Sequence, residues 1–127
     1  FVLLPPGDLP DSVQPEPLLQ ALAPMQTGAL PYWEAGVKRF PDNGRLRFGY
    51  ANALWQDGRT DAALRAYRAT VARAPDLAPA WNNLAYALRD SGQPDQAREA
   101  VCRARQLAPE DDNVADSVAE ITDGRGC

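Results

Sequence analysis

The sequence predicts an all-α protein built as a helix–turn–helix solenoid, and three observations lead to that prediction. The first is an internal repeat, because residues 44–77 and 78–111 are two copies of one 34-residue pattern. The second is the helical spacing of apolar residues within each copy. The third is a glycine in the middle and a proline near the end of each copy, where helices should stop. One such unit cannot bury its apolar face alone, so the copies should stack on each other.

The N-terminal segment, residues 1–14, does not follow the repeat. It opens with the apolar run Phe-Val-Leu-Leu, which is too short for a membrane span or a signal-peptide core. Pro5, Pro6 and Gly7 then stop any regular element. We expect residues 1–4 to be the last strand of an upstream domain and the rest to be a linker, so that the chain is the C-terminal part of a larger protein. An expression artefact or a processed N-terminus is the alternative.

Residues 15–43 are expected to form a degenerate hairpin of the same kind. Pro41 stands one repeat period before Pro75, and counting back from it places Trp33 at the aromatic position of the second helix. An interior proline removes a helical hydrogen bond, so the hairpin should be shortened or kinked. The interrupting residues are Pro24, Gly28 and Pro31.

Residues 44–77 and 78–111 each predict two helices joined by a short turn. In the second copy the first helix carries apolar residues at i, i+3, i+4 and i+7, which share one helix face. Gly92 suits a left-handed helix end, and Pro94 suits the first turn of the next helix. The first stripe consists of Trp81, Leu84, Ala85 and Leu88. The second stripe, which ends before Pro109, consists of Ala97, Ala100, Val101 and Ala104.

Residues 112–123 predict a capping helix that covers the last repeat. Asp112 or Asn113 can cap its first turn, and the acidic residues there suit the positive end of the helix dipole. Val114, Val118 and Ile121 recur at helical spacing and should face the repeat. Solenoid ends need such a cover with a polar outer face.

Over residues 44–111 the pattern resembles the tetratricopeptide repeat (TPR). That family has a large residue, Leu, a small residue and a large residue on the first helix, then Ala, an aromatic residue, Ala and Pro on the second. Arg47 departs at the first position, and Val101 replaces the usual aromatic residue. The first copy supplies Arg47, Tyr50, Ala51, Leu54, Ala63, Tyr67, Thr70 and Pro75. The second copy supplies Trp81, Leu84, Ala85, Leu88, Ala97, Val101, Ala104 and Pro109.

The resemblance implies a TPR-type solenoid of about three repeats plus a C-terminal capping helix, which binds a peptide or partner segment in a concave groove. Asparagine can hold a peptide backbone, Trp55 and Tyr86 offer rigid aromatic area, and Arg89 can bind a carboxylate. The implied groove residues are Phe48, Asn52, Trp55, Gln56, Asn82, Asn83, Tyr86, Arg89 and Asp90.

Several of these positions have an alternative role. Trp55 could instead cover the interface with the degenerate hairpin, and the asparagines could simply be solvated. Trp33 and Trp81 are expected to pack in the core. Chaperone-binding TPR modules grip a terminal carboxylate with Lys and Asn, but Phe48 stands where the first Lys belongs, which argues against such a clamp.

Composition excludes several other kinds of function. The chain has no His, which removes the commonest general base and most zinc sites, so we expect no catalytic, cofactor-binding or metal-binding residues and no enzyme activity. A net charge of −4 and a pI near 4.7 argue against nucleic acid as a partner, and no apolar stretch is long enough for membrane insertion. Twelve Arg against one Lys and frequent Ala suggest a high-GC bacterial genome, with a cytoplasmic or cell-envelope location left open.

The two cysteines are expected to be unpaired thiols. Cys102 lies on the second helix of its repeat, and Cys127 lies on a tail that should be mobile. A disulfide needs the two Cα atoms within about 7 Å, so this tail would have to fold back.

Two further hypotheses compete with a free-standing interaction module. Residues 1–10 followed by TPRs look like the join in bacterial proteins with an upstream C39-type (papain-like) cysteine peptidase domain. This chain would then position substrate for the peptidase or tether it. The other hypothesis is self-association, through stacked terminal repeats or through residues 1–4 adding to a strand edge.

Overall fold

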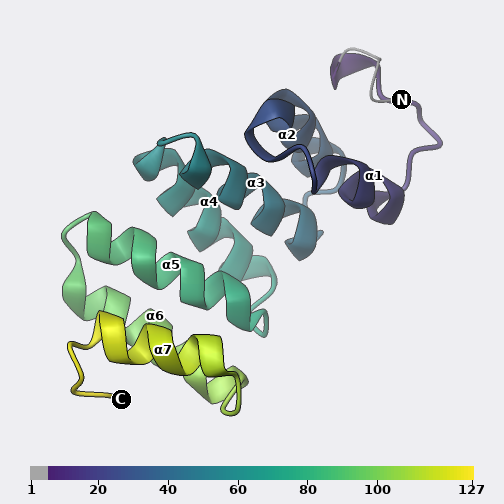
Figure 1. Cartoon of the computed structure of the whole chain (residues 1–127). Coiled ribbons are helices and arrows are strands. Elements are labelled where there is room, and N and C mark those ends of the chain that lie inside the picture. Colours follow the sequence, from purple (N-terminus) through teal and green to yellow (C-terminus); the bar gives the residue numbers. More distant parts are fainter. Residues whose placement is uncertain (1–5) are drawn as a thin grey trace.

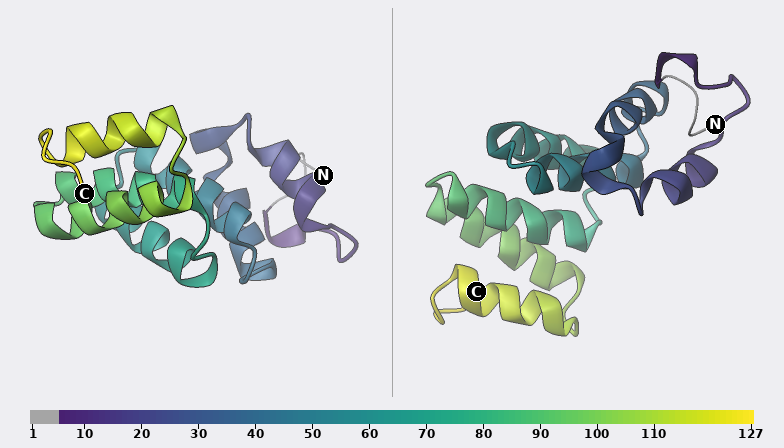
Figure 2. Two further views of the ribbon diagram at one scale, coloured as in Figure 1. Left: turned by 90° about the horizontal axis from the view of Figure 1, so that it is seen from below. Right: turned by 45° about the horizontal axis from the view of Figure 1, so that its top comes forward.

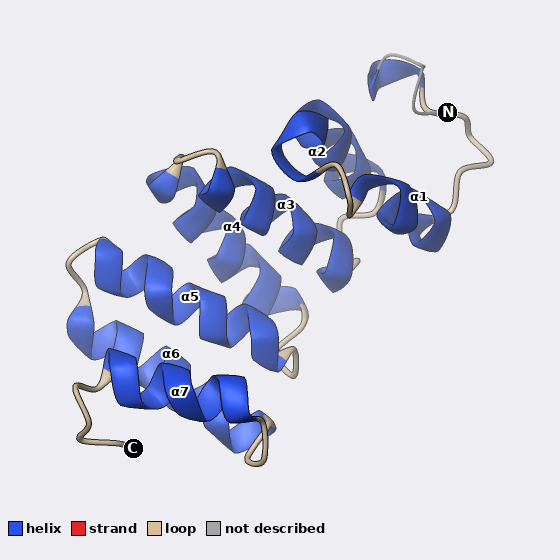
Figure 3. Ribbon diagram, in the orientation of Figure 1, coloured by secondary structure: helices blue, strands red, loops and turns tan. Residues whose placement is uncertain are grey.

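The structure is a computed structural model, and it describes residues 6–127. The described residues form helices and loops with no strand (Figure 3). The strand expected at residues 1–4 lies outside the described part of the chain. The α-helices are α1 (Pro15–Leu22), α2 (Leu30–Arg39), α3 (Gly44–Gln56), α4 (Thr60–Arg73), α5 (Ala78–Asp90), α6 (Pro94–Leu107) and α7 (Asp112–Ile121). The short 3-10 helices are η1 (Pro6–Asp8) and η2 (Gln26–Ala29).

In the described part of the chain, the helices form three consecutive hairpins followed by one single helix. Each hairpin packs on the next in chain order, and α1 and α7 lie at opposite ends of the stack (Figures 1 and 2). α7 packs on α6 and α5 at the end of the stack. The prediction of an all-α TPR-type solenoid with about three repeats and a C-terminal capping helix is confirmed.

Small residues allow the two regular hairpins to pack closely. Ala51 and Ala63 of the α3–α4 hairpin are fully buried, as are Ala85 and Ala97 at the same positions of α5–α6. The turn inside each hairpin uses a glycine with positive φ, 78° at Gly58 and 76° at Gly92. A residue with a side chain adopts this left-handed conformation only at a cost, which explains the glycine in each repeat.

Arg47, which departs from the family pattern, replaces one interaction of the usual large residue. It occupies the same repeat position as Trp81, whose indole N–H donates to the carbonyl of Pro75 at 2.8 Å. The Nε–H of Arg47 donates to the carbonyl of Pro41, the equivalent group one repeat earlier. Trp81 itself is only half-buried, so it is less a core residue than expected.

The N-terminal hairpin is shorter than the others, as expected. α1 has 8 residues and α2 has 10, against 13 and 14 in α3 and α4. Pro24 occupies the repeat position of Gly58, and the fixed negative φ of proline excludes the left-handed turn. The chain forms η2 there instead. Trp33 is 1% exposed and fills the core of this hairpin, which confirms the expected packing role.

Part of the segment expected to be a linker lies against α2. Leu9 is 6% exposed. The guanidinium of Arg39 donates to the carbonyls of Leu9 and Pro10, at 3.1 Å and 2.9 Å. These contacts attach residues 9 and 10 to the N-terminal hairpin.

The cap of α7 lies one residue earlier than expected. The carboxylate of Asp111, not Asp112 or Asn113, accepts from the backbone N–H groups of Asn113 and Val114, at 2.8 Å and 3.2 Å. Val114 and Ile121 are buried against the last repeat.

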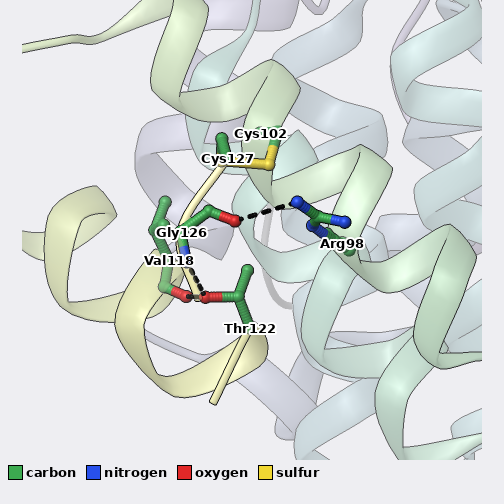
Figure 4. The surroundings of a disulfide bond; sticks show 6 residues. All are labelled: Arg98, Cys102, Val118, Thr122, Gly126 and Cys127. Atoms are coloured by element: carbon green, nitrogen blue, oxygen red, sulfur yellow. Dashed lines mark hydrogen bonds between the residues drawn. A yellow bond between two sulfur atoms is a disulfide. The ribbon is translucent and has the colours of Figure 1, made fainter. Parts of the chain in front are cut away.

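The expectation of two free thiols is wrong, because Cys102 and Cys127 form a disulfide (Figure 4). Their Cα atoms lie 5.7 Å apart. The tail after α7 folds back onto α6 with the help of three residues of positive φ, 53° at Asp123, 81° at Gly124 and 74° at Gly126. The polar composition of the tail predicted a mobile segment. It gives no sign of the turn that brings Cys127 back to α6.

Candidate functional site

The surface along the first helices of the hairpins contains an apolar pocket of about 530 Å³. It lies between α1, α3 and the start of α5. Arg45 and Glu16 form an ion pair across its rim, with Nη1 and Oε1 3.1 Å apart. Its apolar lining is Leu19, Ala23, Trp33, Phe48, Gly49, Leu77 and Pro79. The polar residues around it are Glu16, Gln20, Arg45 and Asn52.

A second, more polar pocket of about 300 Å³ adjoins the first, and Asn52 lines both. Its residues come from α3, α4 and α5. They are Asn52, Trp55, Gln56, Tyr67, Asn83, Tyr86, Arg89 and Asp90. We call these two pockets together the groove.

Asn52, which lines both pockets, is the centre of a small hydrogen-bond cluster. Its Oδ1 accepts from the hydroxyl of Tyr67 and from Nδ2 of Asn83, the latter at 3.0 Å. Within the described residues, no protein group bonds to Nδ2 of Asn52 or to Oδ1 of Asn83. The cluster therefore presents one amide donor and one amide acceptor to the groove.

Burial raises the pKa of Tyr67 to about 12, and its contact with Asn83 offsets part of that effect. The phenol is therefore protonated near neutral pH and remains a hydrogen-bond donor to Asn52. This fixes the amide of Asn52 with its oxygen toward Tyr67 and its nitrogen toward the groove.

At the other end of the groove, Tyr86 and Arg89 bind the carboxylate of Glu120 from α7. The hydroxyl of Tyr86 donates to Oε2 of Glu120 at 2.7 Å and lies 3.2 Å from Oγ of Ser117. Nη1 of Arg89 lies 3.4 Å from Oε1 of Glu120, and its guanidinium carbon lies 5.0 Å from the centre of the Tyr86 ring. The hydrogen bond from Tyr86 lowers the pKa of Glu120, which keeps this carboxylate ionised.

Most residues expected in the groove line the second pocket. They are Asn52, Trp55, Gln56, Asn83, Tyr86 and Arg89, with Asp90 beside them. Trp55 is half-buried and its side chain both lines the pocket and packs on the core. Phe48 lines the first pocket. Asn82 lines neither pocket, and its Oδ1 is buried with no hydrogen-bond partner among the described residues.

The sequence reasoning missed the groove residues supplied by α1 and α7. Glu120 stands one repeat period after Tyr86, and Ser117 stands one period after Asn83. Extending the repeat into the capping helix would have identified both. The α1 residues Leu19 and Ala23 give no such signal, because the period breaks at Pro24.

Among residues 6–127, no group of three or more His, Cys, Asp or Glu residues could hold a metal ion. No helix in residues 6–127 has both the length and the apolar character needed to span a membrane.

Comparison with known families and proteins agrees with this architecture. Two family models described as tetratricopeptide repeat match residues 27–78 and 54–121, and the second covers more than half of the chain. The "TPR repeat-containing protein PA4667" of Pseudomonas aeruginosa is 33% identical over 100 residues, which is 74% of this chain and 17% of that protein. The human "Protein O-mannosyl-transferase TMTC1" is 35% identical over 61 residues, 48% of this chain and 7% of that protein. The chain thus spans a small fraction of each of these relatives.

Solved structures share the fold. The MamA RS-1 ArsTM double mutant superposes with a TM-score of 0.73 at 26% identity, covering 86% of this chain and 64% of that one. YrrB, described as a TPR protein with an unusual peptide-binding site, gives 0.71 at 20% identity, covering 84% and 58%. The Yersinia enterocolitica chaperone SycD, solved with a peptide of the translocator YopD, gives 0.74 at 17% identity, covering 84% and 91%.

The family matches leave residues 1–10 uncovered, so the resemblance to a peptidase join stays a prediction. For the repeats themselves, the 34-residue period, the stacked hairpins and the family matches indicate the same family. The chain belongs to the tetratricopeptide repeat family.

Proposed function

We propose that this chain is a protein–protein interaction module that binds an extended segment of a partner protein in the groove. The observation that carries the proposal is the pair of adjoining pockets, one apolar and one polar, that share Asn52. Helical solenoids commonly use such extended surfaces for binding. Three other statements remain predictions from the sequence: the chain is not an enzyme, it does not bind nucleic acid, and it can self-associate.

The amides of Asn52 and Asn83 supply contacts to a peptide backbone. A peptide unit offers one N–H donor and one C=O acceptor, and the cluster presents the complementary pair, Nδ2 of Asn52 and Oδ1 of Asn83. Because Tyr67 fixes the orientation of Asn52, little rotational freedom is lost on binding.

The apolar pocket supplies a place for a large side chain of the same segment. At about 530 Å³ it has room for a branched aliphatic or aromatic residue, and Phe48 and Leu19 line it from two different helices. Burying such a side chain contributes about 1.5–3 kcal/mol to binding. The segment would therefore join one apolar anchor to a stretch held through its backbone.

Two proteins of the same fold are described as binding peptides. YrrB has a peptide-binding site and SycD was solved with a peptide of YopD. Both are 20% identical or less to this chain, so they support the class of ligand and not its sequence.

The test is selection of ligands from a displayed library of random peptides, followed by binding measurements on Asn52→Asp. This substitution keeps the oxygen that accepts from Tyr67 and removes the donor that faces the groove. We expect the dissociation constant to rise roughly tenfold or more. Gln106→Glu adds the same charge at an exposed position of α6 and serves as the control. Selected peptides that bind Asn52→Asp as tightly as the wild type would place their site outside the groove.

A further inference from the structure

We propose that the Cys102–Cys127 disulfide is a redox-controlled latch on α7. In the oxidised chain it holds Glu120 in the site formed by Tyr86 and Arg89, and its reduction frees that site for an acidic side chain of a partner. The inference rests on the proposed function of the groove and names the regulation of one end of it.

The first step is that α7 is joined covalently to α6 at both ends. The chain runs from the end of α6 through a short loop into α7, and the disulfide returns Cys127 to Cys102 in the middle of α6. In the oxidised chain a detached α7 stays confined within this closed loop, whereas in the reduced chain its C-terminal end is free. Detached α7 therefore has more conformational entropy in the reduced chain, which favours detachment there.

Hydrogen bonds of the tail connect the disulfide to the C-terminal end of α7 (Figure 4). Arg98 of α6 donates to the carbonyl of Gly126 at 3.2 Å. The backbone N–H of Gly126 donates to Oγ1 of Thr122 at 2.9 Å, and that hydroxyl donates to the carbonyl of Val118. The disulfide therefore belongs to a continuous set of bonds that ends on the last turn of α7.

The third step is that this last turn carries the group that occupies the groove. Glu120 lies between Val118 and Thr122 and accepts from Tyr86 and Arg89, two residues that also line the polar pocket. Any partner carboxylate that used these two donors would have to displace it. Movement of α7 removes the Glu120 carboxylate and leaves both donors in place on α5, where Arg89 keeps its pair with Asp90, Nε to Oδ1 at 3.3 Å.

The chemistry of the latch is thiol–disulfide exchange. Two molecules of a thiol reductant are oxidised to their disulfide, the Cys102–Cys127 bond breaks, and each cysteine sulfur gains one proton and one electron. Cys127 is an exposed residue, which suits attack by a thiolate from solvent. The bond persists in an oxidising compartment and opens in a reducing one.

The test compares the full chain with and without dithiothreitol, with Cys127→Ser as the matched variant. We expect amide hydrogen exchange across α7 to become roughly 30-fold faster or more on reduction, with α3 and α4 unchanged. Cys127→Ser should show the fast exchange without reductant and no further response to it. Equal exchange in the oxidised and reduced chains would overturn the proposal.

The second arm follows the Arg89 Nε–H signal by NMR while N-acetylglutamate is added as a probe. The signal should shift in the reduced chain and in Cys127→Ser, and stay in place in the oxidised chain. Equal shifts in both forms would show that Glu120 does not block the site, which also overturns the proposal. Neither arm uses a peptide, so a failure of the latch and a failure of peptide binding are separate results.

Discussion

The N-terminal hairpin and the two regular repeats use different side chains at equivalent positions to achieve the same stacking. Trp33, Tyr67 and Val101 occupy one position of three successive repeats, and all three are buried. In the N-terminal hairpin the large Trp33 ring needs space, which Gly49 of α3 provides. A Cβ atom at Gly49 would lie 2.3 Å from that ring. The equivalent residue in the next repeat is Asn83, which has room for a side chain.

The difference shows that a repeat can lose its family pattern and still stack if a neighbour compensates. In the regular repeats, small alanines on both helices set the packing. In the N-terminal hairpin, one aromatic side chain packs against a glycine of the following repeat. The Trp33–Gly49 contact adds to a core that also contains Leu18, Leu22 and Leu46, and four sets of variants can test the contrast.

The largest effect is expected for Trp33→Ala. Removing a fully buried indole should lower the free energy of unfolding by about 3–5 kcal/mol. The loss should fall on α1 and α2, and hydrogen exchange by segment would show it while urea unfolding gives its size. Val101→Ala removes a smaller side chain from the equivalent position and should cost less. Equal losses for the two variants would remove the contrast.

The second effect is a loss of stability at alkaline pH that depends on Tyr67. Its pKa is about 12 in the folded chain, against about 10 when unfolded, so the folded state holds the proton more tightly. Its contribution is complete below about pH 10 and is lost as the pH rises through about 12, and the loss amounts to about 2–3 kcal/mol. Tyr67→Phe should lack this part of the pH dependence, as measured by urea unfolding across the alkaline range. Identical profiles would contradict it.

The third effect is that of Gly49→Ala. The added methyl group meets the Trp33 ring, and such overpacking costs about 1–3 kcal/mol. Asn83→Ala, at the equivalent position, should cost about 1 kcal/mol through one lost hydrogen bond. Thermal unfolding of both variants measures the difference. If Gly49→Ala were the milder of the two, the close approach of Trp33 would not limit packing there.

The smallest effect is expected for Gly58→Ala and Gly92→Ala. Nothing lies within 4 Å of a Cβ at either glycine, so only the positive φ opposes the change, at about 1 kcal/mol each. Pro24→Ala, at the equivalent position of the N-terminal hairpin, should cost less because no left-handed turn exists there. Denaturant unfolding of the three variants checks this order, and a larger cost at Pro24 would reverse it.

The repeat period predicted the fold because each residue type has one physical role at its position. It located the helices, the glycine turns and most of the residues that line the polar pocket. Phe48 lines the apolar pocket together with residues of α1, whereas Asn82, at the same position one repeat later, lines no pocket of the groove. Equivalent residues of successive repeats therefore have different surroundings, which the repeat pattern does not show.

The rest depends on contacts that a repeat pattern does not encode. The disulfide required three positive φ values in a short polar tail, and only Gly124 and Gly126 hint at them. The contact of Glu120 with Tyr86 and Arg89 joins the capping helix to the groove. Extending the repeat period into α7 gives the position of Glu120 but does not show which residues it binds.

The covalent closure of α7 also determines how the chain carries mechanical load. A force applied at Cys127 passes through the disulfide into α6 and bypasses the 25-residue span up to Cys127 that contains α7. Stretching the oxidised chain should therefore release a contour length shorter by roughly 80–90 Å than stretching the reduced chain. A reductant would convert this helix from a protected element into one that carries the tension directly.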